Sequence, residues 1–190
     1  MHPKKWLMVF INVIGGAAVL GSYVQGILAH PNAAETLWGG VPQNIRPIYT
    51  ANMFLAVAGY FAFTYFILFR LKPQETRVLH RFGFGVFNFL YTAILLPSAL
   101  WMPLTFSAVE QSSLALLWAV RMVLAITGVA SLGLLFSIVK VEPPAGFEPP
   151  AGFEPHKPAR AHRLAIAGSA VFCIQTVILD AIVWVAFFQV

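Results

Sequence analysis

Two ionisable residues, Arg121 and Asp180, stand inside long apolar runs of the sequence. A charged side chain at the centre of a bilayer costs about 2.5–3.5 kcal/mol on insertion scales, so it normally faces the interior of a helix bundle and finds a partner there. Arg121 follows Leu114 by seven residues and Asp180 precedes Phe188 by eight, which predicts similar depths for the two charges. We therefore predict a buried Arg121–Asp180 ion pair. It either fixes the register of two helices or lines a cavity that binds an anionic group or relays protons.

Other polar side chains lie in the apolar runs at spacings that place them on shared helix faces. On the last run, Ser169, Cys173, Thr176, Asp180 and Trp184 recur at steps of three or four residues. The residues predicted to bind a ligand or form the buried polar pair are Arg121, Asp180, Asn52, Asn88, Tyr91, Thr176 and Trp184. The alternative is that these hydroxyl and amide groups bond across helices and serve packing.

The sequence holds no motif of conventional catalysis. All five histidines lie at or beyond the ends of the apolar runs, so no pair is placed to hold a haem inside a membrane. Cys173 is the single cysteine and cannot form an internal disulfide or a CxxC pair. Zinc-protease, serine-hydrolase and phosphate-loop motifs are absent as well. We expect no cofactor and no metal, and an enzyme is the least favoured functional class.

The elements that must position these residues are transmembrane helices. Hydrophobic residues make up 59% of the 190 residues and charged residues only 10%, against about 25% charged in ordinary soluble domains. Five apolar runs are long enough to cross a bilayer, which takes about 20 residues each. The predicted fold is an all-α polytopic membrane helix bundle, a single membrane domain over residues 1–190 with spans at about 6–29, 48–69, 82–104, 113–139 and 164–188.

The basic residues predict an orientation for this bundle. They gather at the N-terminus and in the second and fourth connections, whereas the first connection carries only Arg46 and the third, 105–112, carries none. The positive-inside rule then places the N-terminus in the cytoplasm and the C-terminus on the opposite side. We expect the bilayer to be a bacterial inner (plasma) membrane. Because the basic residues form no separate domain, the net charge of +5 does not indicate a nucleic-acid partner.

Two connections have features of their own. The fourth, about 140–163, duplicates the hexapeptide PPAGFE at 143–148 and 149–154, and its proline content predicts an extended cytoplasmic loop. The first, 30–47, is long and rich in glycine and polar residues. It is either a lid over a cavity between the helices or an ordinary solvated connection.

Part of the chain resembles a known family. Five spans, a first loop that bears Trp38 and ends in Pro47-Ile48-Tyr49, and the run Ala56-Val57-Ala58-Gly59-Tyr60 are similar to the tryptophan-rich sensory protein family. That resemblance implies a five-helix bundle that binds porphyrins or sterols. It covers about a quarter of the chain, and the fifth run lacks the Pro-Trp pattern of the family. No binding residue is carried over.

Three functional classes remain open from the sequence. The first is a small membrane protein that binds an apolar or anionic small ligand between its helices, as a sensor, carrier or ligand-binding protein. The second is an accessory subunit of a larger membrane complex or of a homo-oligomer. The third is an intramembrane enzyme without a cofactor. A ligand-binding bundle would hold its ligand beside Arg121 and Asp180, whereas an accessory subunit would present an extended apolar face to its partner.

Overall fold

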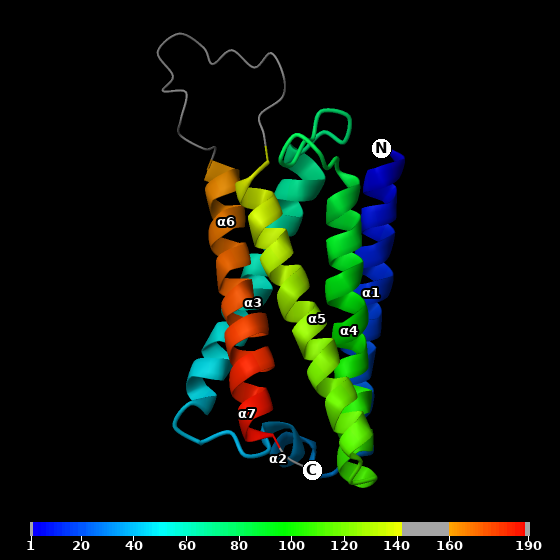
Figure 1. Ribbon diagram of the computed structural model, residues 1–190, viewed down its shortest axis with the longest axis vertical. Coiled ribbons are helices and arrows are strands. Elements are labelled where there is room, and N and C mark those ends of the chain that lie inside the picture. Colours follow the sequence, from blue (N-terminus) through cyan, green and yellow to red (C-terminus); the bar gives the residue numbers. More distant parts are fainter. Residues whose placement is uncertain (1, 142–159, 189–190) are drawn as a thin grey trace.

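The chain folds into long helices that run up and down the molecule, as the computed structural model shows for residues 2–141 and 160–188 (Figure 1). Five of them are long and apolar enough to cross a membrane: Pro3–Ala29, Arg46–Arg70, Gly85–Glu110, Leu114–Val139 and Arg160–Phe187. Within these described ranges no strand forms. For the described residues, the prediction of an all-helical bundle with five helices long and apolar enough to cross a membrane is confirmed. The side of the membrane that each end faces stays a prediction, and the PPAGFE repeat lies outside the described residues.

Some of the spans combine more than one element. The helix α1 covers Pro3–Ala29, α4 covers Gly85–Glu110 and α5 covers Leu114–Val139. The second span consists of α3, Arg46–Tyr65, and a π-helical turn η1, Phe66–Arg70. The last consists of α6, Arg160–Cys173, a longer π-helix η2, Ile174–Trp184, and the short α7, Val185–Phe187. A short helix, α2 (Ala33–Trp38), follows α1 in the first connection.

Local chemistry explains several of the helix ends. Proline stands in the first turn of α1 and of α3, where the missing amide hydrogen removes no intrahelical bond. The Ser113 hydroxyl accepts a hydrogen bond from the Leu116 amide at 3.4 Å and caps α5. The helix α4 continues past the predicted end of the third span at about 104, as far as Glu110. Its last turns stay helical because Thr105 and Ala108 are fully buried against the bundle.

The two ends of the bundle differ in character. One end holds the N-terminus of α1, the 71–84 connection and the start of α6, and we call it the basic end because it carries Lys4, Arg77, Arg81 and Arg163. The other end holds α2, the turn between α4 and α5, and α7, and we call it the α2 end (Figure 1). Within the 71–84 connection, Val78 and Phe82 form an isolated antiparallel β-bridge through two backbone hydrogen bonds.

The helices pack side by side in the order α1, α4, α5, α6 with η2, and α3. Figure 1 shows α5 running obliquely, beside α6 at the basic end and beside α4 at the α2 end. At the closest contact of α3 with α6, a Cβ atom on Gly59 would lie 2.4 Å from the carbonyl oxygen of Gly168. Backbones approach this closely only where both residues lack a side chain. These two glycines therefore set the register of α3 against α6.

A single side-chain hydrogen bond joins α1 to α3, the two helices at the ends of this packing order. The Tyr60 hydroxyl donates to Oδ1 of Asn12 at 2.6 Å, and the Asn12 amide donates to the carbonyl of Met8 at 2.8 Å. The Tyr60 ring also lies 5.3 Å from Phe63 and 5.8 Å from Tyr91. An aromatic core thus fills the half of the bundle nearer the basic end.

Replacing Tyr60 with Phe should loosen α1 without disturbing this core. The ring stays, but Oδ1 of Asn12 loses its donor, which costs about 1–2 kcal/mol. Tyr65→Phe is the matched control, because the Tyr65 side chain is exposed and no hydrogen bond of its hydroxyl occurs within the described ranges. Thermal unfolding in detergent should show a lower midpoint for Tyr60→Phe only. Equal midpoints for the two variants would contradict the structural role of this bond.

Candidate functional site

Asp180 lies on the π-helix η2 and belongs to a chain of hydrogen bonds between two helices. Its Oδ1 accepts from the Gln175 side-chain amide at 2.8 Å, and Oε1 of Gln175 accepts from Nδ2 of Asn52 at 3.1 Å. Nδ2 of Asn52 is also 3.5 Å from the carbonyl oxygen of Val171. The chain therefore runs from α3 across to η2 and ends on a carboxyl group. π-Helical turns inside longer helices occur frequently at functional sites.

The predicted Arg121–Asp180 ion pair is not formed in the structure. Within the described ranges Lys72 forms an ion pair with Glu75 at 3.1 Å, and Nε2 of His30 lies 2.9 Å from Oε1 of Glu110, both at the ends of the helices. Arg121 instead places its guanidinium carbon 4.9 Å from the ring centroid of Trp118, and its Nε is buried without a hydrogen-bond partner.

The register of α5 against η2 explains why the two charges do not meet. A Cβ atom on Gly128 would lie 3.3 Å from the carbonyl oxygen of Thr176, so these two positions face each other. The helices run in opposite directions, and Asp180 therefore lies opposite Leu124, about one helical turn from Arg121. Asp180 satisfies part of its hydrogen-bonding capacity with Gln175 instead.

Aromatic side chains from α1, α3, α4 and η2 gather at the end of the bundle that holds Asp180. The hydroxyl of Tyr49 on α3 donates to the carbonyl oxygen of Leu179, the residue before Asp180. The Tyr23 ring on α1 lies 5.8 Å from Trp101 on α4, which lies 5.7 Å from Trp184 on η2. We call five residues of this end the α2-end cluster, namely Tyr23, Tyr49, Trp101, Asp180 and Trp184. Nε1 of Trp101 is buried and has no hydrogen-bond partner among the described residues.

The first connection packs over the α2-end cluster. Nε1 of Trp184 donates to the carbonyl oxygen of Leu37 at 2.8 Å, and the Trp38 ring meets the Tyr49 ring edge-on at 5.7 Å. Gly39 has a positive φ of 50° and lies against Phe188, where a Cβ atom would come within 2.7 Å of the Phe188 ring. Only glycine combines this backbone conformation with so close a contact. The connection therefore packs against this end of the bundle, and whether it acts as a lid or as an ordinary connection stays a prediction.

The structure divides the predicted site residues into three groups. Asp180 and Trp184 belong to the α2-end cluster, and Asn52 reaches it through Gln175. Tyr91 lies in the aromatic core, where its hydroxyl is 2.7 Å from that of Thr64. The others are elsewhere: the Thr176 hydroxyl donates to a carbonyl of its own helix, Asn88 bonds the Lys4 carbonyl at the basic end, and Arg121 stacks on Trp118.

Four members of the site are not among the predicted residues, namely Tyr23, Tyr49, Trp101 and Gln175. Gln175 and Asp180 are five positions apart, which is about 140° around an α-helix and thus on different faces. In a π-helix with its i to i+5 hydrogen bonds the same two residues come onto one face. The sequence signal for Tyr23 is its neighbours Ser22 and Gln25, which mark a polar stretch of α1.

The chemistry of this cluster is that of hydrogen bonding inside an aromatic enclosure. It offers the carboxyl group of Asp180, the phenol of Tyr23 and the indole donor of Trp101, whereas the Tyr49 hydroxyl already donates to the carbonyl oxygen of Leu179. No group of three or more histidine, cysteine, aspartate or glutamate side chains able to hold a metal occurs within 2–141 and 160–188. No family model, no curated protein and no solved structure matches the chain.

Proposed function

We propose that this membrane bundle binds a small, largely apolar ligand at the α2-end cluster, through a polar group that both donates and accepts a hydrogen bond. The observation that carries the proposal is that this end of the bundle holds both a carboxyl acceptor and an unpartnered indole donor, linked by the ring contact of Trp101 with Trp184, which lies four residues from Asp180 on η2. Asp180 has one carboxyl oxygen that accepts from Gln175, and Trp101 has a buried indole N–H without a partner in the described ranges. Buried donors in folded proteins are almost always paired, so an unpaired one calls for an explanation.

The surroundings of Asp180 favour a neutral or cationic polar group over an anionic one. No arginine or lysine forms an ion pair with Asp180 in the described part of the chain, so a second negative charge beside it would be repelled. The rings of Tyr23, Trp101 and Trp184 provide the apolar contact surface. Pockets for small molecules are mostly apolar with a few placed polar groups, and the cluster has this composition.

The accessory-subunit alternative is supported by a different observation, the exposure of α1. Only Met8 and Gly26 of this helix are buried, and nothing lies within 4 Å of a Cβ built on Gly16 or Gly21. By contrast, 44% of the most apolar part of α4 and of α5 is buried. Lipid covers such a face, and so would another subunit or a second copy of this chain.

Small molecules that co-purify with the protein test the binding proposal. The full chain and its variants are purified in mild detergent, and organic extracts are compared by mass spectrometry. Asp180→Asn removes the charge and replaces one acceptor oxygen with an amide donor. A hydrogen bond to a charged group is worth about 1.5–3 kcal/mol, so the substitution should lower the amount of a bound compound at least tenfold. Trp101→Phe keeps the ring but removes the indole donor and should deplete the same compound.

Each variant has a matched control. Glu110→Gln changes a carboxyl group at the same end of the bundle, and Trp118→Phe changes a tryptophan that is 61% exposed and outside the cluster. Both should retain the compound at the level of the unmodified chain. Identical extracts from all five proteins would refute the binding proposal. A protein recovered in stoichiometric amount with every variant would favour the accessory-subunit alternative.

A further inference from the structure

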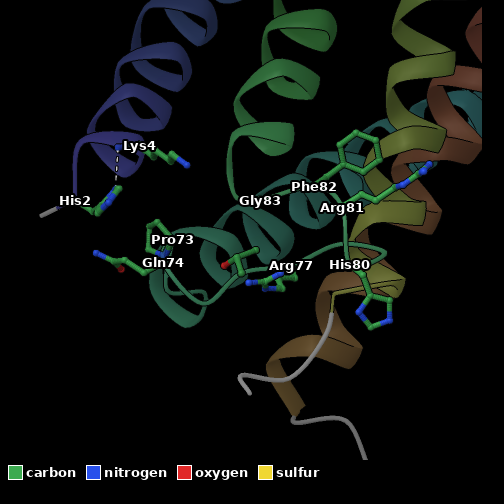
Figure 2. A pocket seen from close by; sticks show the side chains of 10 residues that line it. His2, Lys4, Pro73, Gln74, Arg77, His80, Arg81, Phe82 and Gly83 are labelled. Atoms are coloured by element: carbon green, nitrogen blue, oxygen red, sulfur yellow. Dashed lines mark hydrogen bonds between the residues drawn. The ribbon is translucent and has the colours of Figure 1, made fainter. Parts of the chain in front are cut away.

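At the basic end, far from the α2-end cluster, two adjoining pockets lie between the start of α1, the 71–84 connection and the start of α4 (Figure 2). The first has a volume of about 330 Å³ and the second about 410 Å³. Lys4, Arg81, Phe82 and Gly83 line both. Figure 2 shows Lys4 on the first turn of α1, on one side of the first pocket, and Arg77 on the connection opposite. The pockets therefore form one continuous depression.

The two halves of this depression differ in chemistry. The first half is cationic, since Lys4, Arg77 and Arg81 line it and no acidic residue does. Lys72 forms an ion pair with Glu75, but none of those three side chains forms one within the described ranges. The second half continues over the apolar side chains of Val86 and Phe89. Phe89 is 71% exposed and Phe82 is 53% exposed, so both rings are open to a ligand.

The position of the depression matches the boundary of the membrane-spanning segments. Lys4 is in the first turn of the span that begins at Pro3, and Arg81 precedes the span that begins at Gly85 by four residues. Lysine and arginine at this level lie among lipid headgroups. Val86 and Phe89 line the second half of the depression, which therefore lies at the level of the acyl chains. The Asn88 amide donates to the Lys4 carbonyl at 3.1 Å and holds the first turn of α1 against α4.

From this we infer that the depression is a binding site for an anionic glycerophospholipid. Its phosphate lies between Lys4 and Arg77, and its acyl chain lies along Phe82, Val86 and Phe89. Arginine forks are well suited to phosphate oxygens, and each basic residue near an anionic headgroup adds binding energy. A water-soluble phosphate compound has no apolar part to contact Val86 and Phe89. The apolar half of the depression therefore favours a lipid as the occupant.

Native mass spectrometry of the detergent-purified full chain tests this site with added phosphatidylglycerol and phosphatidylcholine as probes. Phosphatidylglycerol should bind at least about tenfold more tightly, because only its headgroup has a net negative charge. The double variant Arg77→Gln/Arg81→Gln should abolish this preference. The control Arg160→Gln/Arg163→Gln removes two exposed charges from the same end, outside the depression, and should keep it. Equal affinity for the two lipids, or an equal loss in the control, would overturn the inference.

A second comparison separates a lipid from a water-soluble phosphate compound. Phe89→Gln makes the apolar half polar and should weaken phosphatidylglycerol several-fold while leaving glycerol phosphate unchanged. Phe61→Gln, another exposed phenylalanine on a different helix, is the control and should weaken neither. Glycerol phosphate that binds as tightly as the lipid, together with no effect of Phe89→Gln, would also overturn the inference. Neither result depends on Asp180, so this test is independent of the α2-end cluster.

Discussion

Placing alanine at Gly59 or at Gly168 should lower the stability of the bundle by about 2 kcal/mol or more, the cost of overpacking a close contact. A Cβ on Gly59 would lie 2.4 Å from the Gly168 carbonyl oxygen, and one on Gly168 would lie 2.8 Å from the Gly59 Cα. Neither neighbour is a flexible side chain, so α3 and α6 must move apart. Inside a membrane this separation is costly, since close packing rather than water exclusion holds the helices together.

Gly16→Ala and Gly21→Ala are the controls for this prediction. Nothing lies within 4 Å of a Cβ at either position, and alanine favours a helix over glycine by about 1 kcal/mol. The chain carries its own probe of unfolding, because Cys173 is its single cysteine and is buried. A fluorogenic maleimide that reacts with this thiol on heating should report lower midpoints for the Gly59 and Gly168 variants and unchanged or higher ones for the controls. Four equal midpoints would show that the close contact has no energetic role.

The same substitutions should also impair the α2-end cluster. The Asn52–Gln175 hydrogen bond lies seven residues from the Gly59–Gly168 contact on both helices, so a change in the separation of α3 and α6 acts on it directly. We therefore expect Gly59→Ala to reduce retention of a bound compound along with stability. A variant that loses stability and still keeps the compound would show that binding at the α2-end cluster does not depend on the register of α3 against α6.

Trp184→Ala should be the most damaging single change at the α2 end. Its ring is 4% exposed, stacks on Phe188 at 4.1 Å and meets Trp101 edge-on at 5.7 Å. Removing so large a buried side chain costs about 3–5 kcal/mol. The indole N–H of Trp184 also donates a hydrogen bond to the carbonyl oxygen of Leu37, which holds the first connection against η2.

Trp184→Phe separates the two contributions of this residue. It keeps most of the ring packing and removes only the bond to Leu37, so the loss of stability should be about 1 kcal/mol. Hydrogen exchange of the 33–41 segment should nevertheless increase, because the first connection is no longer bonded to η2. Trp118→Ala, at a tryptophan that is 61% exposed, should change neither quantity beyond the loss of its contact with Arg121. Unchanged exchange in Trp184→Phe would contradict the role of this bond.

Much of the fold follows from the sequence because hydrocarbon imposes few solutions. A continuous apolar run of about 20 residues must be helical to satisfy its own backbone in lipid, and five such runs predicted five helices. The third span was predicted to end at about 104, whereas the helix α4 continues to Glu110, with Thr105 and Ala108 fully buried against other helices.

The candidate site was less predictable, and the reason is geometric. The ion-pair prediction relied on α-helical rise and on equal depth from the helix ends, whereas the actual partners depend on helix register and on the π-helical turn around Asp180. Gln175 is invisible to a search for α-helical periodicity, because it joins Asp180 at a spacing of five. Trp101 belongs to the cluster through its contact with Trp184, and no local sequence pattern around Trp101 predicts that it lies near Asp180.

By itself the sequence determined that this chain is a bundle of five apolar helices and that Asp180 is a costly residue in need of partners inside it, since both statements depend only on the solvation of individual side chains. Only the tertiary structure decided which partners those are. Helix register and rotation are set by contacts between distant segments, such as Gly59 with Gly168, and a local pattern of residues contains no information about the contacts of another helix.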